Sequence, residues 1–123
     1  MPELPEVETI RRGLAPLVEG RAIARLVVHD ARWCAPLSVD EVADAVRGRR
    51  VEALRRRGKY LIWDLEDDVR LVTHLRMTGN YLYDAPADQP YRRVTVALSD
   101  GHEVGFFDPR RFGTGVVTFG DDG

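Results

Sequence analysis

Residues 49–84, RRVEALRRRGKYLIWDLEDDVRLVTHLRMTGNYLYD, decide the fold class. They divide into short runs rich in β-branched, leucine and aromatic residues, separated by Gly-, Asp- and Asn-containing breaks such as EDD and TGN. Further runs of the same kind follow at 92–100, 102–108 and 113–119. Short strands at this spacing, with no helical pattern between them, predict an antiparallel β-sandwich.

Helical patterns are confined to the first part of the chain. Pro5 suits a first helical turn, and an apolar stripe follows at helical spacing, made of Val7, Ile10, Leu14 and Leu17. Pro16 is expected to kink or end this helix, with Gly20 beyond its end. Residues 21–30 form a strand-like run.

A second, shorter helix is predicted at 38–48. Ser38 and Glu41 have the spacing of a capping box, and Gly48 lies past the expected end. The fold class predicted for residues 1–123 is therefore α+β: a sandwich of short antiparallel strands with two helices packed alongside.

Composition limits the possible functions without choosing one. The chain has 123 residues, a net charge of −2 and no apolar run of membrane-spanning length, and its start lacks the order of a signal peptide. We therefore expect a cytoplasmic protein. Cys34 is the single cysteine, which excludes an internal disulfide and a cysteine-based zinc site within the chain, and the three histidines have no metal-ligand spacing.

The distribution of charge is compatible with two interpretations, nucleic-acid binding and solvated surface charge. A negative net charge argues weakly against nucleic-acid binding, yet the basic residues are arginines except for Lys59, and they cluster at 55–57, 92–93 and 110–111. Arginine is suited to binding phosphate through two parallel hydrogen bonds. Solvated surface charge is the other interpretation, and composition leaves both open.

The opening MPELPEVET contains a possible nucleophile. Removal of Met1 would leave Pro2 with a secondary amine, and a terminal amine has an ordinary pKa of about 7.7–8.0, far below that of lysine. Such an amine can attack a sugar carbon and form a positively charged iminium. Glu3 and Glu6 lie one helical turn apart and are candidates for a general acid and a positioning group. Alternatively, these residues only start a helix.

Four ordered motifs resemble one enzyme family. PELPEVETIRRGL, RRGKYLIWDL, THLRMTG and DPRRFG occur in the order and at the separations typical of formamidopyrimidine-DNA glycosylases of the Fpg/Nei family. The resemblance implies a base-excision repair enzyme that removes oxidised purines, such as 8-oxoguanine and formamidopyrimidines, and then cleaves the abasic strand by β,δ-elimination. In that scheme Pro2 attacks C1′ of the deoxyribose, Glu3 protonates the sugar oxygen and Glu6 positions the amine and water.

The same resemblance implies roles for residues of the later motifs. Lys59 would contact the DNA backbone around the lesion and His74 a phosphate. The residues expected to fill the gap left by the flipped base, or to contact DNA beside it, are Met77, Arg110, Arg111 and Phe112. Without the resemblance, a strand histidine and a methionine or phenylalanine beside a turn would be assigned to the core. Arg76 departs from the family, because many relatives have glycine there.

The resemblance also implies what lies outside this chain. Relatives follow this domain with a helix–two-turn–helix module and usually a zinc finger, which one cysteine cannot form. We therefore expect residues 1–123 to be an N-terminal catalytic domain without a cofactor of its own, a monomer whose partner is double-stranded DNA containing oxidised purines. The remaining alternatives are a non-catalytic DNA-binding module and a tautomerase with an N-terminal proline, which usually starts a strand rather than a helix.

Overall fold

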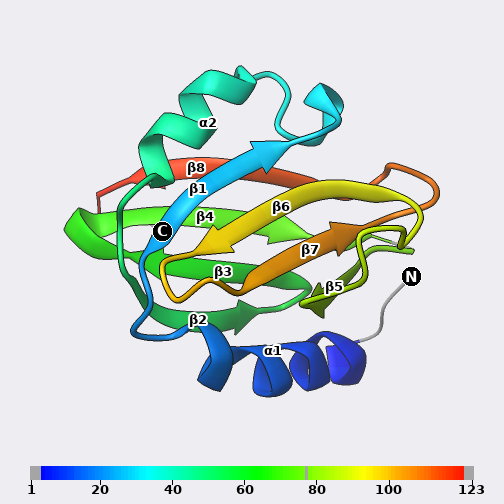
Figure 1. Cartoon of the computed structure of the whole chain (residues 1–123), viewed down its shortest axis with the longest axis horizontal. Helices are drawn as coiled ribbons and strands as arrows, with labels where there is room; N and C mark the ends of the chain where they lie inside the picture. The colour runs from blue at the N-terminus through cyan, green and yellow to red at the C-terminus, as the bar shows by residue number, and fades with distance from the viewer. Residues whose placement is uncertain (1–3, 77, 121–123) are drawn as a thin grey trace.

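The computed structural model describes residues 4–76 and 78–120, which form two helices, eight strands and two short 3₁₀ turns (Figure 1). The elements, in chain order, are α1 (Leu4–Val18), β1 (Ile23–Val28), η1 (Ala31–Trp33), α2 (Val39–Val46), β2 (Val51–Arg57), β3 (Tyr60–Leu65), η2 (Glu66–Asp68), β4 (Val69–His74), β5 (Asn80–Tyr83), β6 (Arg92–Leu98), β7 (Glu103–Phe107) and β8 (Thr114–Phe119).

The strands form two four-stranded antiparallel sheets that pack face to face. One sheet has the order β1-β6-β7-β5 and the other the order β2-β3-β4-β8. In the second sheet Tyr60 pairs with His74, which pairs in turn with Thr114, so the start of β3, the end of β4 and the start of β8 form one row. The α+β sandwich predicted from the sequence is confirmed.

Alternation along the strands places the core between the sheets. Leu61, Trp63 and Leu65 of β3 are at most 2% exposed, whereas Tyr60 at the start of the strand is 45% exposed. Apolar side chains from both sheets meet those of β3, and the largest fully buried ones include Phe106, Leu54, Leu71, Leu75 and Ile23. This apolar layer stabilises the fold because packing the two sheets together removes apolar side-chain surface from water.

Each helix closes one open side of the sandwich. Helix α1 packs against β2, β3 and β5, and thus covers the side where β2 and β5 are the edge strands. Helix α2 packs against β1, β4 and β8, on the side where β1 and β8 are the edges. Covering the edges protects backbone groups that would otherwise be open to pairing with another chain.

Helix α1 differs from its predicted pattern in one position. It runs through Pro16 to Val18, and Leu17 is 36% exposed, whereas Val18 is fully buried. The buried residue of the last turn is therefore the one four positions after Leu14, not the one three positions after it. The prediction for Leu17 was wrong because both positions are apolar, and the sequence period alone cannot separate them.

Helix α2 has the capping box that its sequence predicts. The Glu41 backbone N–H donates to Ser38 Oγ at 3.0 Å, and the Ser38 N–H donates to Glu41 Oε1 at 3.0 Å. Gly48 follows the helix with a φ of +80°, the left-handed conformation that ends helices.

Candidate functional site

One end of the sandwich gathers those predicted site residues that the structure describes. The start of α1, the β2–β3 turn, the segment after β4 and the segment between β7 and β8 lie together there (Figure 1). This follows from the antiparallel registers, which bring the row of Tyr60, His74 and Thr114 to the same end. The pairing of Asn80 with Phe107 brings the start of β5 and the end of β7 there as well.

Lys59 lies in the tight turn between β2 and β3. Arg57 pairs with Tyr60, so Gly58 and Lys59 form a two-residue hairpin turn. Gly58 has a φ of +60°, which a side chain would disfavour. Lys59 is half-buried in this turn, where its position is fixed by the register of the hairpin.

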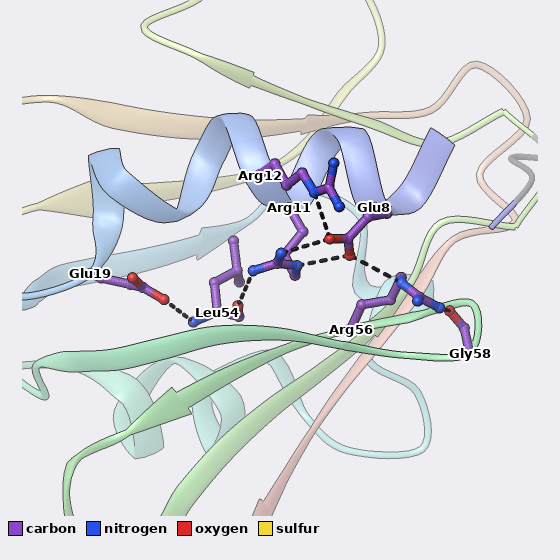
Figure 2. A network of polar contacts seen from close by, with 7 residues as sticks. All are labelled: Glu8, Arg11, Arg12, Glu19, Leu54, Arg56 and Gly58. Carbon is purple, nitrogen blue, oxygen red and sulfur yellow. Dashed lines mark hydrogen bonds and ion pairs between the residues drawn. The ribbon is translucent and has the colours of Figure 1, made fainter. Parts of the chain in front are cut away.

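Glu8 connects helix α1 to this hairpin (Figure 2). Its carboxylate accepts hydrogen bonds from Arg11 at 2.6 and 2.9 Å, from Arg12 at 2.9 Å and from Arg56 of β2 at 3.1 Å. Arg56 also donates to the carbonyl oxygen of Gly58 at 3.1 Å. The hydrogen bond from Arg11, aided by Arg56 and Arg12, lowers the pKa of Glu8 to about 2, so Glu8 is ionised at neutral pH.

Arg11 of α1 and Glu19, the residue after its end, satisfy the open edge of β2. The backbone N–H of Leu54 donates to Glu19 Oε2 at 2.8 Å, and its carbonyl accepts from Arg11 at 3.5 Å (Figure 2). Because β2 is an edge strand, these groups have no strand partner on that side. The helix that leads from the predicted nucleophile is therefore fixed along its length to the strand that leads to Lys59.

His74 ends β4 as a neutral hydrogen-bond donor. Its Nδ1 accepts the backbone N–H of Arg76 at 2.9 Å, and its ring lies edge-on to Tyr60 with centroids 4.8 Å apart. Burial lowers the pKa of His74, as do the positive charges of Arg76 and Lys59. The ring is neutral at pH 7, and Nε2 carries the proton. A neutral N–H donor suits a phosphate oxygen.

Between β7 and β8 the chain forms a loop around Asp108, which is fully buried. Its carboxylate accepts the backbone N–H groups of Arg110 at 3.1 Å and Gly113 at 2.8 Å, and the hydroxyl of Thr78. Its carbonyl oxygen accepts the N–H of Arg111 at 3.3 Å. These four hydrogen bonds to Asp108 give the loop a defined shape although it has no regular secondary structure.

The loop presents two side chains to solvent side by side. Phe112 is 53% exposed, and the Arg110 guanidinium lies 6.0 Å from the centroid of its ring. Within residues 4–76 and 78–120, no carboxylate lies within ion-pair distance of Arg110. Arg111 differs, because its Nε is 3.8 Å from a carboxylate oxygen of Asp30 and its φ is +58°.

Arg76 has a left-handed backbone with a φ of +56°. Glycine adopts this conformation without steric cost, whereas arginine does not. The glycine that the family resemblance implies at this position would remove this steric cost, and the Arg76 side chain is exposed to solvent.

Three of the predicted site residues, Pro2, Glu3 and Met77, lie outside the described residues, and their roles stay predictions. Glu6 is exposed in the first turn of α1, which begins at Leu4. The helix expected directly after Pro2 is therefore present.

Sequence reasoning missed two carboxylates that shape the site. Glu8 received no role from its sequence position, although it links α1 to β2. Asp108 was part of a motif but received no role. An Asp before a proline is a common turn signal, and this signal could have identified Asp108 as the residue that organises its loop.

The described residues contain neither a metal-ligand cluster nor a membrane-spanning helix. Across residues 4–76 and 78–120, no group of His, Cys, Asp and Glu side chains is arranged to hold a metal ion, and Cys34 is buried without a disulfide. In the same part of the chain, no helix has both the length and the apolar character needed to cross a membrane.

Comparison with known proteins identifies the family. A family model described as the formamidopyrimidine-DNA glycosylase N-terminal domain matches residues 1–115. The chain belongs to this family. A formamidopyrimidine-DNA glycosylase of Ruegeria pomeroyi is 46% identical over 125 residues, covering 92% of this chain and 43% of that protein. One from Acidiphilium cryptum is 45% identical over 115 residues, covering 92% and 40%. The chain thus spans about two fifths of the length of these formamidopyrimidine-DNA glycosylases.

Solved structures of the family agree with this assignment. The Lactococcus lactis enzyme in complex with DNA containing a formamidopyrimidine lesion has a TM-score of 0.85 and 34% identity, covering 94% of this chain and 43% of that one. A complex of the Lactococcus lactis enzyme with DNA containing an abasic site matches with the same values. The similarity covers the fold and nearly the full length of this chain.

Proposed function

We propose that this chain is the N-terminal catalytic domain of a base-excision repair enzyme, a DNA glycosylase that removes oxidised purines and then cleaves the abasic strand. The observation that carries the proposal is the gathering of Lys59, His74, Arg110 and Phe112 at one end of the sandwich, next to the first turn of α1. Family membership supports it, because the relatives are named formamidopyrimidine-DNA glycosylases.

The proposed chemistry begins at the chain terminus. After removal of Met1, the Pro2 amine attacks C1′ of the damaged nucleotide, the bond between C1′ and the base breaks, and the base leaves with a proton. Glu3 protonates the sugar ring oxygen as the ring opens, which leaves an iminium between Pro2 and C1′. The iminium then withdraws electrons while the sugar loses protons, so that first the 3′ and then the 5′ phosphate leaves. Glu6 helps to position the amine and a water molecule.

The described residues support a DNA-binding role around this centre. Lys59 supplies a positive charge and His74 a neutral donor, both suited to phosphate oxygens. Arg110 and Phe112 would occupy the space vacated by an everted nucleotide, which offsets the cost of a few kcal/mol for unstacking a base. The helix–two-turn–helix module and the zinc finger of a complete enzyme would come from outside this chain, and the DNA would lie between the two halves.

Borohydride trapping tests this proposal. We expect the full-length protein with a free Pro2 amine to become covalently linked to an 8-oxoguanine duplex on reduction. Protein that retains Met1, checked by mass spectrometry, should give no adduct, because its Pro2 nitrogen is locked in an amide. The variant Pro2→Gly should lose most excision, and Pro86→Gly, at an exposed loop proline, is the matched control.

Two outcomes would contradict the proposal. Binding of the lesion duplex without any adduct would favour a non-catalytic DNA-binding module. An adduct formed by protein that still carries Met1 would refute the assignment of Pro2 as the nucleophile.

A further inference from the structure

Two loops at the site converge on one buried carboxylate. The loop of residues 75–79, between β4 and β5, contributes the Thr78 hydroxyl, which donates to Asp108 Oδ1. The loop of residues 108–113 contributes the backbone N–H groups of Arg110 and Gly113, which donate to Oδ1 and Oδ2 at 3.1 and 2.8 Å. Since Asp108 is 0% exposed, water does not compete for these hydrogen bonds.

The two loops also pack against the same aromatic ring, that of Phe106. A Cβ added to Gly79 would lie 2.7 Å from the Phe106 ring, and one added to Gly113 would overlap the same ring. The backbones of both loops therefore lie so close to the Phe106 ring that neither glycine has room for a side chain. Phe106 is 1% exposed and belongs to the core, so its ring is held in place by the side chains around it.

Asp108 itself is fixed from a third direction. Its backbone N–H donates to the carbonyl of Tyr91 at 3.0 Å, and its carbonyl accepts Nε of Arg93 at 2.9 Å. Asp108 is thus held by strand β6 and the residue before it, while its carboxylate holds the two loops. An acceptor anchored in this way fixes the position of its donors.

We infer that Asp108 is a positioning residue that joins loops 75–79 and 108–113 into one rigid unit. Arg110 and Phe112 on the second loop are then held in place relative to Thr78 on the first loop, so that the two loops meet DNA as one unit. Two groups on independent loops would each have to be ordered during insertion, at an entropic cost that a joined unit avoids. The inference rests on the proposed function, since it concerns how that site enters DNA.

The test removes one hydroxyl from the full-length protein. Thr78→Val keeps the shape of the side chain but deletes the donor to Asp108, whereas Thr78→Ser keeps the donor. We expect Thr78→Val to slow 8-oxoguanine excision in single-turnover assays about tenfold, which corresponds to about 1.4 kcal/mol. Cleavage of a duplex with a preformed abasic site should change less, because no damaged base has to be unstacked.

Two readouts and a control variant distinguish positioning from a general loss of structure. Fluorescence of 2-aminopurine next to the lesion should rise more slowly with Thr78→Val, and Thr78→Ser should restore the wild-type rise. Hydrogen exchange at the Arg110 and Gly113 amides should be faster in Thr78→Val, although residue 78 makes no bond to either. The matched control is Thr118→Val, because the Thr118 hydroxyl finds no partner among the described residues.

A double-mutant cycle gives the sharpest result. If Thr78 acts through the loop that carries Phe112, the double variant Thr78→Val/Phe112→Ala should excise 8-oxoguanine only slightly more slowly than Phe112→Ala. Additive effects, or unchanged exchange at Arg110 and Gly113 in Thr78→Val, would overturn the inference. Absence of any wild-type adduct in the trapping assay would instead count against the proposed function, and amide exchange would still test the coupling of the loops.

Discussion

Glu8 accepts hydrogen bonds from arginines on two elements, so its charge state affects more than its own helix. Its pKa of about 2 lies below the ordinary value of about 4.3–4.5, which means that the folded state favours the ionised form. A lowered pKa contributes stability above the ordinary pKa, and this contribution is lost as pH falls towards the folded-state value.

The variant Glu8→Gln should therefore be less stable than wild type at pH 7, and the difference should shrink between about pH 5 and pH 2. Urea unfolding at several pH values measures this. Glu52→Gln is the matched control, because Glu52 is an exposed carboxylate of β2 whose contact with Arg50 is 3.6 Å long. A difference that stays constant over this pH range would show that the Glu8 ion pairs do not carry the effect.

At the scale of elements, the close approach of η1 to β8 depends on a glycine. A Cβ on Gly115 of β8 would overlap the indole ring of Trp33, which is 3% exposed. We expect Gly115→Ala to destabilise the fold by about 1–3 kcal/mol, the usual cost of overpacking a core. Gly13→Ala in α1 is the control, because a Cβ there meets nothing within 4 Å and should stabilise the helix by up to about 1 kcal/mol. Thermal unfolding of both variants checks this, and equal melting temperatures would contradict it.

The strands, the two helices and the capping box of α2 could be predicted from the sequence because each depends on local periodicity or on residues three or four positions apart. The order of strands in the two sheets could not, since pairing joins residues as distant as Val28 and Val94. The contacts that shape the site could not be predicted for the same reason. Glu8 and Arg56 are 48 positions apart, and Thr78 and Asp108 are 30 apart, so neither contact leaves a local signal.

At the scale of the whole molecule, the sandwich has a closed core and a functional end. Its two sheets face each other and each open side is covered by a helix, so residues 1–123 should fold when expressed alone. The predicted site, however, occupies one end, and under the proposed function residues outside this chain would hold the flipped nucleotide from the opposite side. Folding and catalysis should thus be separable.

Expressed alone, the 123 residues should bind DNA weakly and almost without regard to the lesion. If Lys59 and one or two of the exposed arginines contact two or three phosphates, affinity should fall by about 10- to 40-fold between about 50 and 200 mM salt, because each cationic contact releases counterions. Excision should be absent or very slow even with Pro2 free. Titration of 8-oxoguanine and undamaged duplexes at both salt concentrations measures this, and Lys59→Ala should lower the salt slope by about one. Tight, lesion-selective binding by the isolated chain would show that recognition of the damaged base lies within residues 1–123.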